Sequence, residues 1–313
     1  MIFITETEDF GKRIDNLVAE RSEMSRSAIQ KLIKNGALRI NLQTVKDKSF
    51  TVKAGDTVEL IVPEPECVDV LAENIPLDIV YEDSDLLVVN KAKGMVVHPA
   101  PGNPSGTLVN ALLYHCHDSL SGINGAIRPG IVHRIDKKTS GLLVVAKNNR
   151  AHMGLARQIS EHSFLRSYQA LCLGKMKSEQ GRIEGNIGRH PTDRKKMAIL
   201  REGGRYAATN WTLIEQFEGF AHVKCILETG RTHQIRVHMS SIGHPLLCDE
   251  VYGSQSTKFE KQNAALVDGQ CLHAKTIGFV HPCTGEELFF DSDLPEYFER
   301  VLDKLRKKND GLQ

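Results

Sequence analysis

The chain has 313 residues, of which 41% are hydrophobic and 25% charged, and its formal net charge is +1. This length allows two domains with separate cores. The sequence lacks an 18-residue apolar run and a signal-like start, so we expect no membrane association and a cytoplasmic location. Seven cysteines without a CxxC pair favour reduced thiols, and they argue against a disulfide framework or a zinc site.

Two short helices and two strands are predicted within the first 60 residues. Apolar residues recur at helical spacing after Arg13 and again after Ser25, a plausible helix N-cap, and Gly36 suits a C-cap. The expected strands cover residues 38–41 and 57–62. A Pro-rich segment then predicts a linker over residues 63–75, between domains spanning residues 1–62 and 76–313.

The charge of this first module is strongly uneven. Residues 12–53 contain ten Lys and Arg but four Asp and Glu, an excess of six that leaves −5 for the rest of the chain. Such a basic helix pair suits contact with a phosphate backbone, with Arg26, Lys31 and Lys34 as candidates. A solvated surface without a partner is the alternative. The module resembles the S4 RNA-binding domain over residues 12–60, which implies RNA binding.

An unusual polar segment lies between two apolar pieces in residues 128–147. Residues 142–146 predict a buried strand, and Ile131 and Val132 predict a short one. Asp136 lies between them with cationic neighbours, which favour its ionised form. An ionised Asp on a rigid support can act as a nucleophile or general base. A polar turn with a structural ion pair accounts for the same residues equally well.

The remaining elements follow in chain order. Strands are expected at residues 79–83, 86–90, 167–171, 223–228 and 287–291, and helices at 107–114, 150–163 and 295–307. Residues 233–239 form a helix or a strand, and in a helix His233 and Arg236 share one face. Residues 187–196 are expected to be a polar loop that binds phosphate or is merely solvated, and residues 253–269 a polar insertion.

Two further sets of side chains have an ordinary structural explanation as an alternative to a functional one. Tyr168 shares a strand face with Ala170, and such a tyrosine is commonly a half-buried core residue. His98, His115 and His117 lie in or beside loops without a Cys or carboxylate at ligand spacing. We therefore expect these histidines to face solvent, and no metal site.

Four motifs together resemble the RluA-type RNA pseudouridine synthases in order and spacing. They are His133–Asp136 with Thr139–Gly141, Arg166–Ala170, Thr229–His238 and Leu272–Ala274. With the S4-like module, the resemblance is to the RluC/RluD-like branch, which modifies large-subunit ribosomal RNA. It implies an α+β catalytic domain with a mixed, mostly antiparallel sheet flanked by helices and loops. The implied partner is RNA, as 23S ribosomal RNA or a pre-50S particle. No cofactor and no metal are implied, and a monomer is expected.

The resemblance also implies roles for individual residues. Asp136 matches the essential aspartate, Tyr168 the tyrosine that packs on the flipped base and removes a proton late, and Arg236 the aspartate's basic partner. Arg134 matches the arginine that enters the RNA stack, since a base must leave the stack before chemistry on it. Cleavage of the N-glycosidic bond builds oxocarbenium-like charge that a carboxylate can stabilise or trap. The other expected RNA-binding residues are His133, Thr139, Arg231, His233, Gln234 and Leu272.

The sequence departs modestly from the family pattern. Ile135, Arg166 and Ala92 replace commoner Leu, Lys and Pro. Cys248 replaces a Gly before Asp249, which would disturb a tight turn if that position needs a positive φ. Three other functions remain open: a transfer-RNA or dual-specificity synthase, a non-catalytic RNA-binding or ribosome-assembly protein, and a glycoside-type hydrolase. The last needs a second acid near Asp136, where the motifs supply Tyr and Arg instead.

Overall fold

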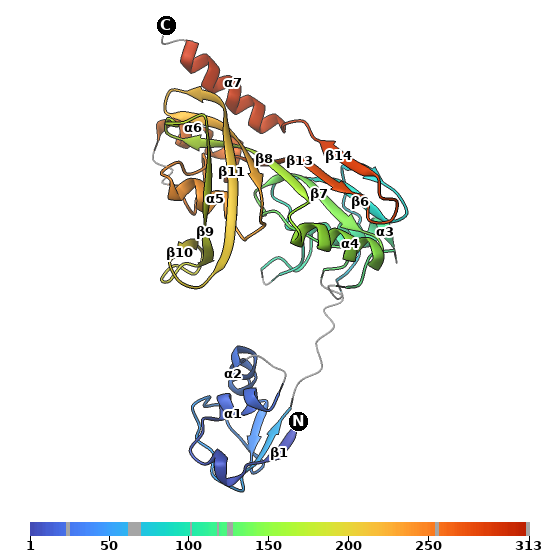
Figure 1. Ribbon diagram of the computed structural model, residues 1–313, viewed down its shortest axis with the longest axis vertical. Helices are drawn as coiled ribbons and strands as arrows, with labels where there is room; N and C mark the ends of the chain where they lie inside the picture. Colours follow the sequence, from blue (N-terminus) through green and yellow to red (C-terminus); the bar gives the residue numbers. More distant parts are fainter. Residues whose placement is uncertain are drawn as a thin grey trace. The chain divides into compact units, whose positions relative to one another are not determined.

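The computed structural model describes residues 1–22, 26–61, 70–100, 102–117, 119–123, 128–253 and 257–310. The chain divides into two compact units, Met1–Cys67 (unit 1) and Val68–Gln313 (unit 2). Each unit has its own hydrophobic core (Figure 1). Most of the expected linker, and Ser25 with its expected capping role, lie outside the described residues. No helix in the described part of the chain is long and apolar enough to cross a membrane.

Unit 1 packs two helices on a small antiparallel sheet. Its elements are β1 (Ile2–Ile4), the 3-10 helix η1 (Thr7–Asp9), α1 (Ile14–Glu20), α2 (Arg26–Lys34), β2 (Leu38–Ile40), β3 (Gln43–Thr44) and β4 (Thr57–Leu60), with strand order β1-β4-β2-β3. The apolar faces predicted for the helices are confirmed, since Ile14, Leu17, Ile29 and Ile33 are buried. Helical periodicity was informative here because helix side chains supply five of the ten buried residues of this core cluster.

Unit 2 is built on one long mixed sheet. Its strands are β5 (Ile79–Glu82), β6 (Leu86–Lys91), β7 (Ser140–Ala146), β8 (Leu165–Leu173), β9 (Gln180–Arg189), β10 (Met197–Leu200), β11 (Arg205–Phe217), β12 (Phe220–Leu227), β13 (Leu272–Val280) and β14 (Glu287–Asp291). The order is β10-β9-β11-β12-β8-β13-β7-β6-β5, with β14 paired to β13. The β13–β7 pair is parallel and the others are antiparallel, as expected.

Five helices accompany this sheet: α3 (Leu108–Cys116), α4 (Asn149–Ser160), α5 (Gln234–Ser241), α6 (Lys258–Val267) and α7 (Glu296–Asp310). The helix α4 lies against β7, and α7 packs on α6 near the C-terminus (Figure 1). The predicted apolar face of α7 is confirmed, because Phe298, Val301, Leu302 and Leu305 are buried in a common cluster. The parallel β13–β7 pair brings the start of β13 beside the residues that follow Asp136.

Several sequence-based expectations for unit 2 were wrong. Residues 253–269 are not a featureless insertion, because α6 starts with a Thr257 capping box and buries Glu260. The strand β9 runs on to Arg189, so the polar loop is shorter than expected. Ile131 makes an isolated bridge to Val145 instead of a strand. His98 is buried instead of facing solvent.

Candidate active site

A cleft of about 1020 Å³ opens in unit 2 where the loop before β7, the turn after β12 and the start of α5 meet. All ten residues of unit 2 that the sequence analysis selected line it. Asp136 is the one acidic side chain among the lining residues. Six arginines line the same cleft: Arg128, Arg134, Arg166, Arg205, Arg231 and Arg236. The electrostatic field in this cleft therefore favours an anionic ligand.

A buried lysine donates hydrogen bonds to the backbone next to Asp136. Lys91, at the end of β6, is 2% exposed, and its ammonium donates to the carbonyls of Ala92, Met95 and Lys137. Burial lowers the pKa of Lys91 to about 7, and the nearby Asp136 charge partly opposes that shift. The amide of Gly94 also donates to the Lys137 carbonyl at 2.9 Å. These contacts fix the position of the loop that carries Asp136.

Arg236 on α5 connects Asp136 to a second, fully buried carboxylate. Its Nη1 donates to Asp136 Oδ2 at 2.9 Å, while Nε and Nη2 donate to the two oxygens of Asp249 at 2.7 and 2.9 Å. Burial would lower the pKa of Arg236, but its bonds to Asp249 outweigh burial and raise it. Asp249 also accepts the backbone amides of Val251 and Tyr252. The guanidinium is thereby fixed in one orientation.

Asp249 was not selected from the sequence, although the position before it drew attention. Cys248 has a φ of +59° and is 1% exposed, so a buried non-glycine residue occupies the left-handed region. Burial tends to raise the pKa of Asp249, and the bonds from Arg236 outweigh it and lower the pKa. Disturbance of this turn was expected only if the position needs a positive φ, and the structure shows that the position has one. The turn at Cys248 places the carboxylate of Asp249 where it orients Arg236.

His233 lies beside the same carboxylate at the start of α5. Its Nε2 is 3.9 Å from Asp136 Oδ2, and its Nδ1 bonds the hydroxyl of Tyr252 at 2.9 Å. The backbone of His233 is left-handed, with a φ of +56°, and α5 begins at the next residue. The helical alternative for this motif is confirmed from Gln234 onward, and His233, as its N-cap, and Arg236 both lie beside Asp136.

Tyr168 and Leu272 lie on neighbouring strands at the apolar side of the cleft. Both are buried and line the cleft, Tyr168 on β8 and Leu272 as the first residue of β13. Burial raises the pKa of Tyr168 to about 12, and the Arg166 charge opposes this shift. The phenol is therefore neutral at pH 7. A flat base fits against such apolar side chains.

Arg134 and His133 differ sharply in exposure and contacts. Arg134 is exposed, and its Nη1 donates to Nε2 of the buried His98 at 3.1 Å. His133 Nε2 accepts the backbone amide of Val144 at 3.1 Å, and burial lowers the pKa of His133 to about 3. His133 is thus a neutral side chain that joins the Asp136 loop to β7, whereas Arg134 is available to a ligand.

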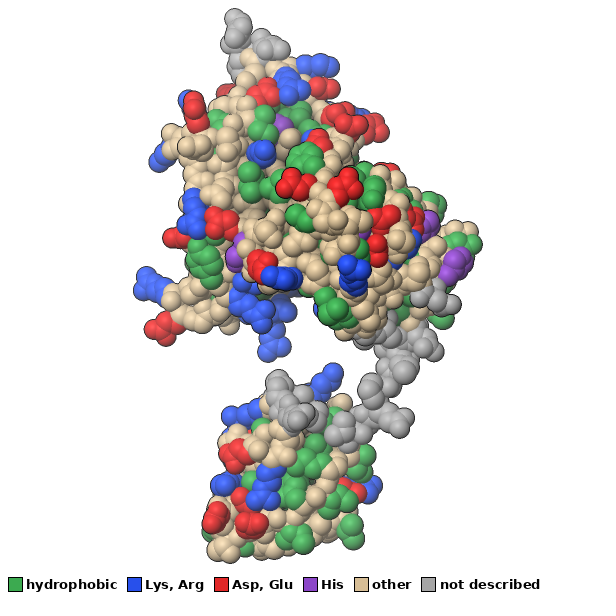
Figure 2. All heavy atoms as spheres, turned by 45° about the vertical axis from the view of Figure 1, so that its right-hand side comes forward, with side chains coloured by type: hydrophobic (Ala, Val, Ile, Leu, Met, Phe, Trp, Pro, Cys, Tyr) green, Lys and Arg blue, Asp and Glu red, His purple; other side chains and the backbone are tan. Residues whose placement is uncertain are grey.

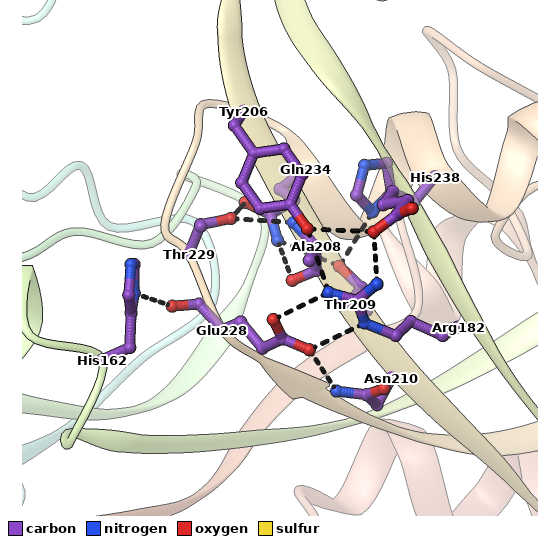
Figure 3. Close-up of polar contacts among 11 residues, drawn as sticks. His162, Arg182, Tyr206, Ala208, Thr209, Asn210, Glu228, Thr229, Gln234 and His238 are labelled. Atoms are coloured by element: carbon purple, nitrogen blue, oxygen red, sulfur yellow. Dashed lines mark hydrogen bonds and ion pairs between the residues drawn. The ribbon is translucent and has the colours of Figure 1, made fainter.

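The Thr229–Arg231 turn is held by a buried hydrogen-bond network (Figure 3). The Gln234 carboxamide accepts from the Thr229 hydroxyl and the Arg231 amide, and it donates to Ala208 and to Thr209. Both amide protons of Gln234 are used in this way, so it positions the turn. Thr139 is also buried, and its hydroxyl accepts from Gln270.

The predicted cations of unit 1 have different surroundings. Two bonds at 3.0 and 2.9 Å join Arg26 to Asp15 Oδ2. Lys31 and Lys34 are exposed in the last turn of α2. Cationic side chains at this end also favour the helix dipole. Arg26 therefore has a structural contact, and the two lysines are the more accessible cations.

Comparison with known proteins places both units in families. Residues 85–241 match the RNA pseudouridylate synthase family, and residues 12–58 match the S4 domain. The chain is 48% identical to the RNA pseudouridine synthase YlyB of Bacillus subtilis, over 98% of both chains. It is 46% identical to the ribosomal large subunit pseudouridine synthase D of Zymomonas mobilis, also over 98% of both. 

A solved structure has the same fold as unit 2. Human RNA pseudouridylate synthase domain containing 1 aligns with a TM-score of 0.57 and 26% identity, covering 78% of this chain and 97% of that one. All residues that line the cleft around Asp136, apart from Leu272, fall within the part of the chain that matches the family. The protein belongs to the RNA pseudouridylate synthase family and is an RNA pseudouridine synthase with an N-terminal S4 domain.

Proposed function

We propose that this enzyme converts specific uridines of 23S ribosomal RNA to pseudouridine, with Asp136 as the catalytic residue. One observation carries the site assignment: Asp136 is the single carboxylate among the lining residues of a cleft with six arginines. The ribosomal target is supported by the relatives from Zymomonas mobilis, Vibrio vulnificus and Pseudomonas aeruginosa, each named ribosomal large subunit pseudouridine synthase D, at 38–46% identity.

In the proposed chemistry, the residues on each side of the cleft have separate roles. The target uridine leaves the RNA stack and its base packs on Tyr168 and Leu272, while Arg134 fills the vacated space through its planar guanidinium. Asp136 Oδ2 is occupied by Arg236, and within the described residues no hydrogen bond engages Oδ1. Oδ1 is therefore the oxygen that faces the sugar as the N-glycosidic bond breaks. The uracil then turns and bonds to the sugar through C5. The C5 proton leaves to the phenolate of Tyr168, which is a minor form at pH 7 but a strong base because the pKa is raised to about 12.

The S4 domain is proposed to add affinity through the RNA backbone. Lys31 and Lys34 are exposed at the end of α2, and phosphate contacts of this kind are independent of sequence. Recognition of the target then depends on RNA shape and on bases that are already looped out.

The test is pseudouridine mapping of ribosomal RNA from cells that lack the gene. The deletion is complemented with wild-type protein or Asp136→Ala. Sites restored by wild type alone identify both the activity and the target uridines. If all ribosomal pseudouridines persist in the deletion, the ribosomal target is wrong and transfer RNA is mapped next. If Asp136→Ala restores the sites equally, the catalytic assignment is wrong.

A further inference from the structure

Arg166 lies on β8, two residues before Tyr168, and its buried guanidinium lies 6.0 Å from the centre of the Phe164 ring but has no carboxylate partner among the described residues. The residue is 5% exposed, and it lines the cleft. Neither Nε nor Nη2 has a hydrogen-bond partner within the described residues, and no carboxylate there lies within ion-pair distance. Buried cations are ordinarily paired. Nε and Nη2 are themselves buried, whereas Nη1 lies beside Gly230 at the cleft. The unpaired charge therefore points to an anionic group that arrives with the ligand and meets Nη1.

Two more arginines extend this charge along the Thr229–Arg231 turn. Arg231 is half-buried and its Nε donates to the Tyr206 carbonyl at 2.9 Å, whereas Arg205 is exposed. Burial, and after it the Arg231 charge, lower the pKa of Arg166. Burial and the Arg205 charge likewise lower the pKa of Arg231. These guanidinium groups repel one another, and a bound anion would relieve that repulsion.

The same turn borders a second hollow. Arg205, Gly230 and Arg231 line both the cleft and this smaller hollow, which Gly188 and Gly204 also line. In the space-filling view, Lys and Arg side chains gather along the lower edge of unit 2 (Figure 2). Arg205 and Arg231 are thus shared by the cleft and the hollow, so a strand that leaves the cleft along this turn stays beside both cations.

Gly230 leaves Arg166 reachable. A Cβ at this position would lie 2.5 Å from Arg166 Nη1, and the φ of Gly230 is not in the positive region. A side chain is therefore excluded by the space that the guanidinium needs and not by the backbone. The bonds from Gln234 fix the turn before any ligand binds. Such a prearranged opening suits a singly charged phosphodiester, whose two free oxygens can each accept from a guanidinium group.

We propose that Arg166, Arg205 and Arg231 bind one phosphodiester of the RNA at Gly230, beside the nucleotide that enters the cleft. This inference rests on the proposed function only in requiring that RNA occupies the cleft. A phosphate offers oxygens to several guanidinium groups at once, and bidentate contact with arginine is the stronger geometry. The phosphate supplies the counter-charge that Arg166 lacks in the free enzyme. 

The test measures RNA binding by the full-length chain. Asp136→Asn is the parent, so that RNA is bound without turnover, and the RNA is the fragment that pseudouridine mapping identifies, ribosomal or not. Arg166→Gln is expected to raise the Kd about tenfold and to reduce the slope of log Kd against log salt by about 0.7 to 0.9. Arg166→Lys should retain the slope, because it keeps the charge.

A neutral methylphosphonate is then placed at each phosphate of the fragment in turn. At one position it should weaken binding by the parent and weaken binding by Arg166→Gln less, since the two changes share one of the three guanidinium contacts. The proposal is overturned if Arg166→Gln keeps the full salt slope and shows no such position. In the enzyme with Asp136 intact, a lower kcat and an altered pH profile for Arg166→Gln would then make Arg166 a positioning residue for Tyr168, its neighbour on β8.

Gly230→Ala keeps the proposal testable if Arg166→Gln does not fold. The added methyl group displaces Arg166 Nη1 and should raise the Kd for RNA about tenfold, the scale of one lost contact to a charged group. Gly122→Ala is the matched control, because its Cβ would meet no atom within 4 Å and its φ is ordinary. Equal Kd values for the two variants would overturn the proposal. A failed ribosomal assignment changes only which RNA fragment is used.

Discussion

Arg236 Nη1 donates to Asp136 Oδ2 at 2.9 Å, and this bond joins residues 100 positions apart in the chain. The other side of the guanidinium is bound by both oxygens of Asp249, whose side chain is fully buried. A rotation of Arg236 that would release Asp136 therefore also breaks two buried charged hydrogen bonds. Asp249 thus contributes to the orientation of Asp136 without touching it.

Arg236→Lys is expected to lower kcat about 10- to 100-fold, because an ammonium cannot bond Asp136 and both oxygens of Asp249 in one plane. KM should change less than threefold, since Arg236 is buried and holds a catalytic group. Steady-state assays on the mapped RNA measure both parameters. Lys275→Arg, at an exposed ion pair on β13, is the control. A raised KM with kcat unchanged would make Arg236 an RNA-binding residue instead.

The sequence was most informative for residues in recognisable motifs and for helices with regular apolar spacing. Asp136, Tyr168 and Arg236 were selected from motifs, and the structure brings them to one cleft. The helix α7 and the two helices of unit 1 followed from apolar spacing. Each of these signals is local, so a single sequence is enough to detect it.

The support of the site was not predictable in the same way. Lys91 and Asp249 reach the Asp136 loop and Arg236 through the folded chain, and nothing near them in sequence indicates those partners. Buried His98 was expected in solvent because its partner, Arg134, is 36 residues away. The helix α6 was missed because its buried face includes polar Glu260 and Asn263, which bond locally. Tertiary contacts outweigh local pattern in all these cases.

Cys248→Val is expected to destabilise unit 2 by about 2 to 3 kcal/mol, because a β-branched side chain is strained at positive φ. Cys172→Val is the matched control, since Cys172 is equally buried but lies within β8. The expected cost there is about 1 kcal/mol, as for a near volume-conserving change. Urea denaturation followed by fluorescence of Trp211, the single tryptophan, measures unit 2. A similar decrease in the free energy of unfolding in both variants would show that the positive φ of residue Cys248 adds no strain.

Unit 2 should lose stability as the pH falls from about 6.5 towards 4. Burial lowers the pKa of His133 to about 3 and those of His222, His238 and His273 to about 4. The unfolded chain binds protons at these groups near pH 6.5 and the folded chain does not, so acid favours unfolding. Each group contributes at most about 1.4 kcal/mol per pH unit between its two pKa values.

The measurement is urea denaturation at half-unit pH steps, again through Trp211 fluorescence. His238→Gln removes one such group. The free energy of unfolding should then change less with pH, by the contribution of one histidine. His115, which is partly exposed and has a carboxylate partner in Glu82, provides the control as His115→Gln. A free energy of unfolding that stays constant from pH 6.5 to 4.5 would show that these histidines are protonated in the folded state.

Unit 1 contains no histidine, so its acid sensitivity should begin at lower pH. Asp15 is fully buried on α1; burial tends to raise its pKa, and bonds from Arg13, Gln30 and Arg26 outweigh burial and lower it to about 2. A depressed carboxyl pKa stabilises the fold above the unfolded value near 4, and that stability is lost as the pH falls towards 2. Asp15→Asn should therefore destabilise unit 1 by roughly 2 kcal/mol at pH 7 and by little near pH 2.

Hydrogen exchange of the full-length chain separates the two units. Peptides from residues 1–61 should exchange faster in Asp15→Asn at pH 7, while peptides from unit 2 serve as an internal control. Asp47→Asn is the matched variant, because Asp47 is in the same unit but bonds Ser49 locally. Equal protection of unit 1 in wild type and Asp15→Asn would mean that the arginine bonds to Asp15 only offset the cost of its burial.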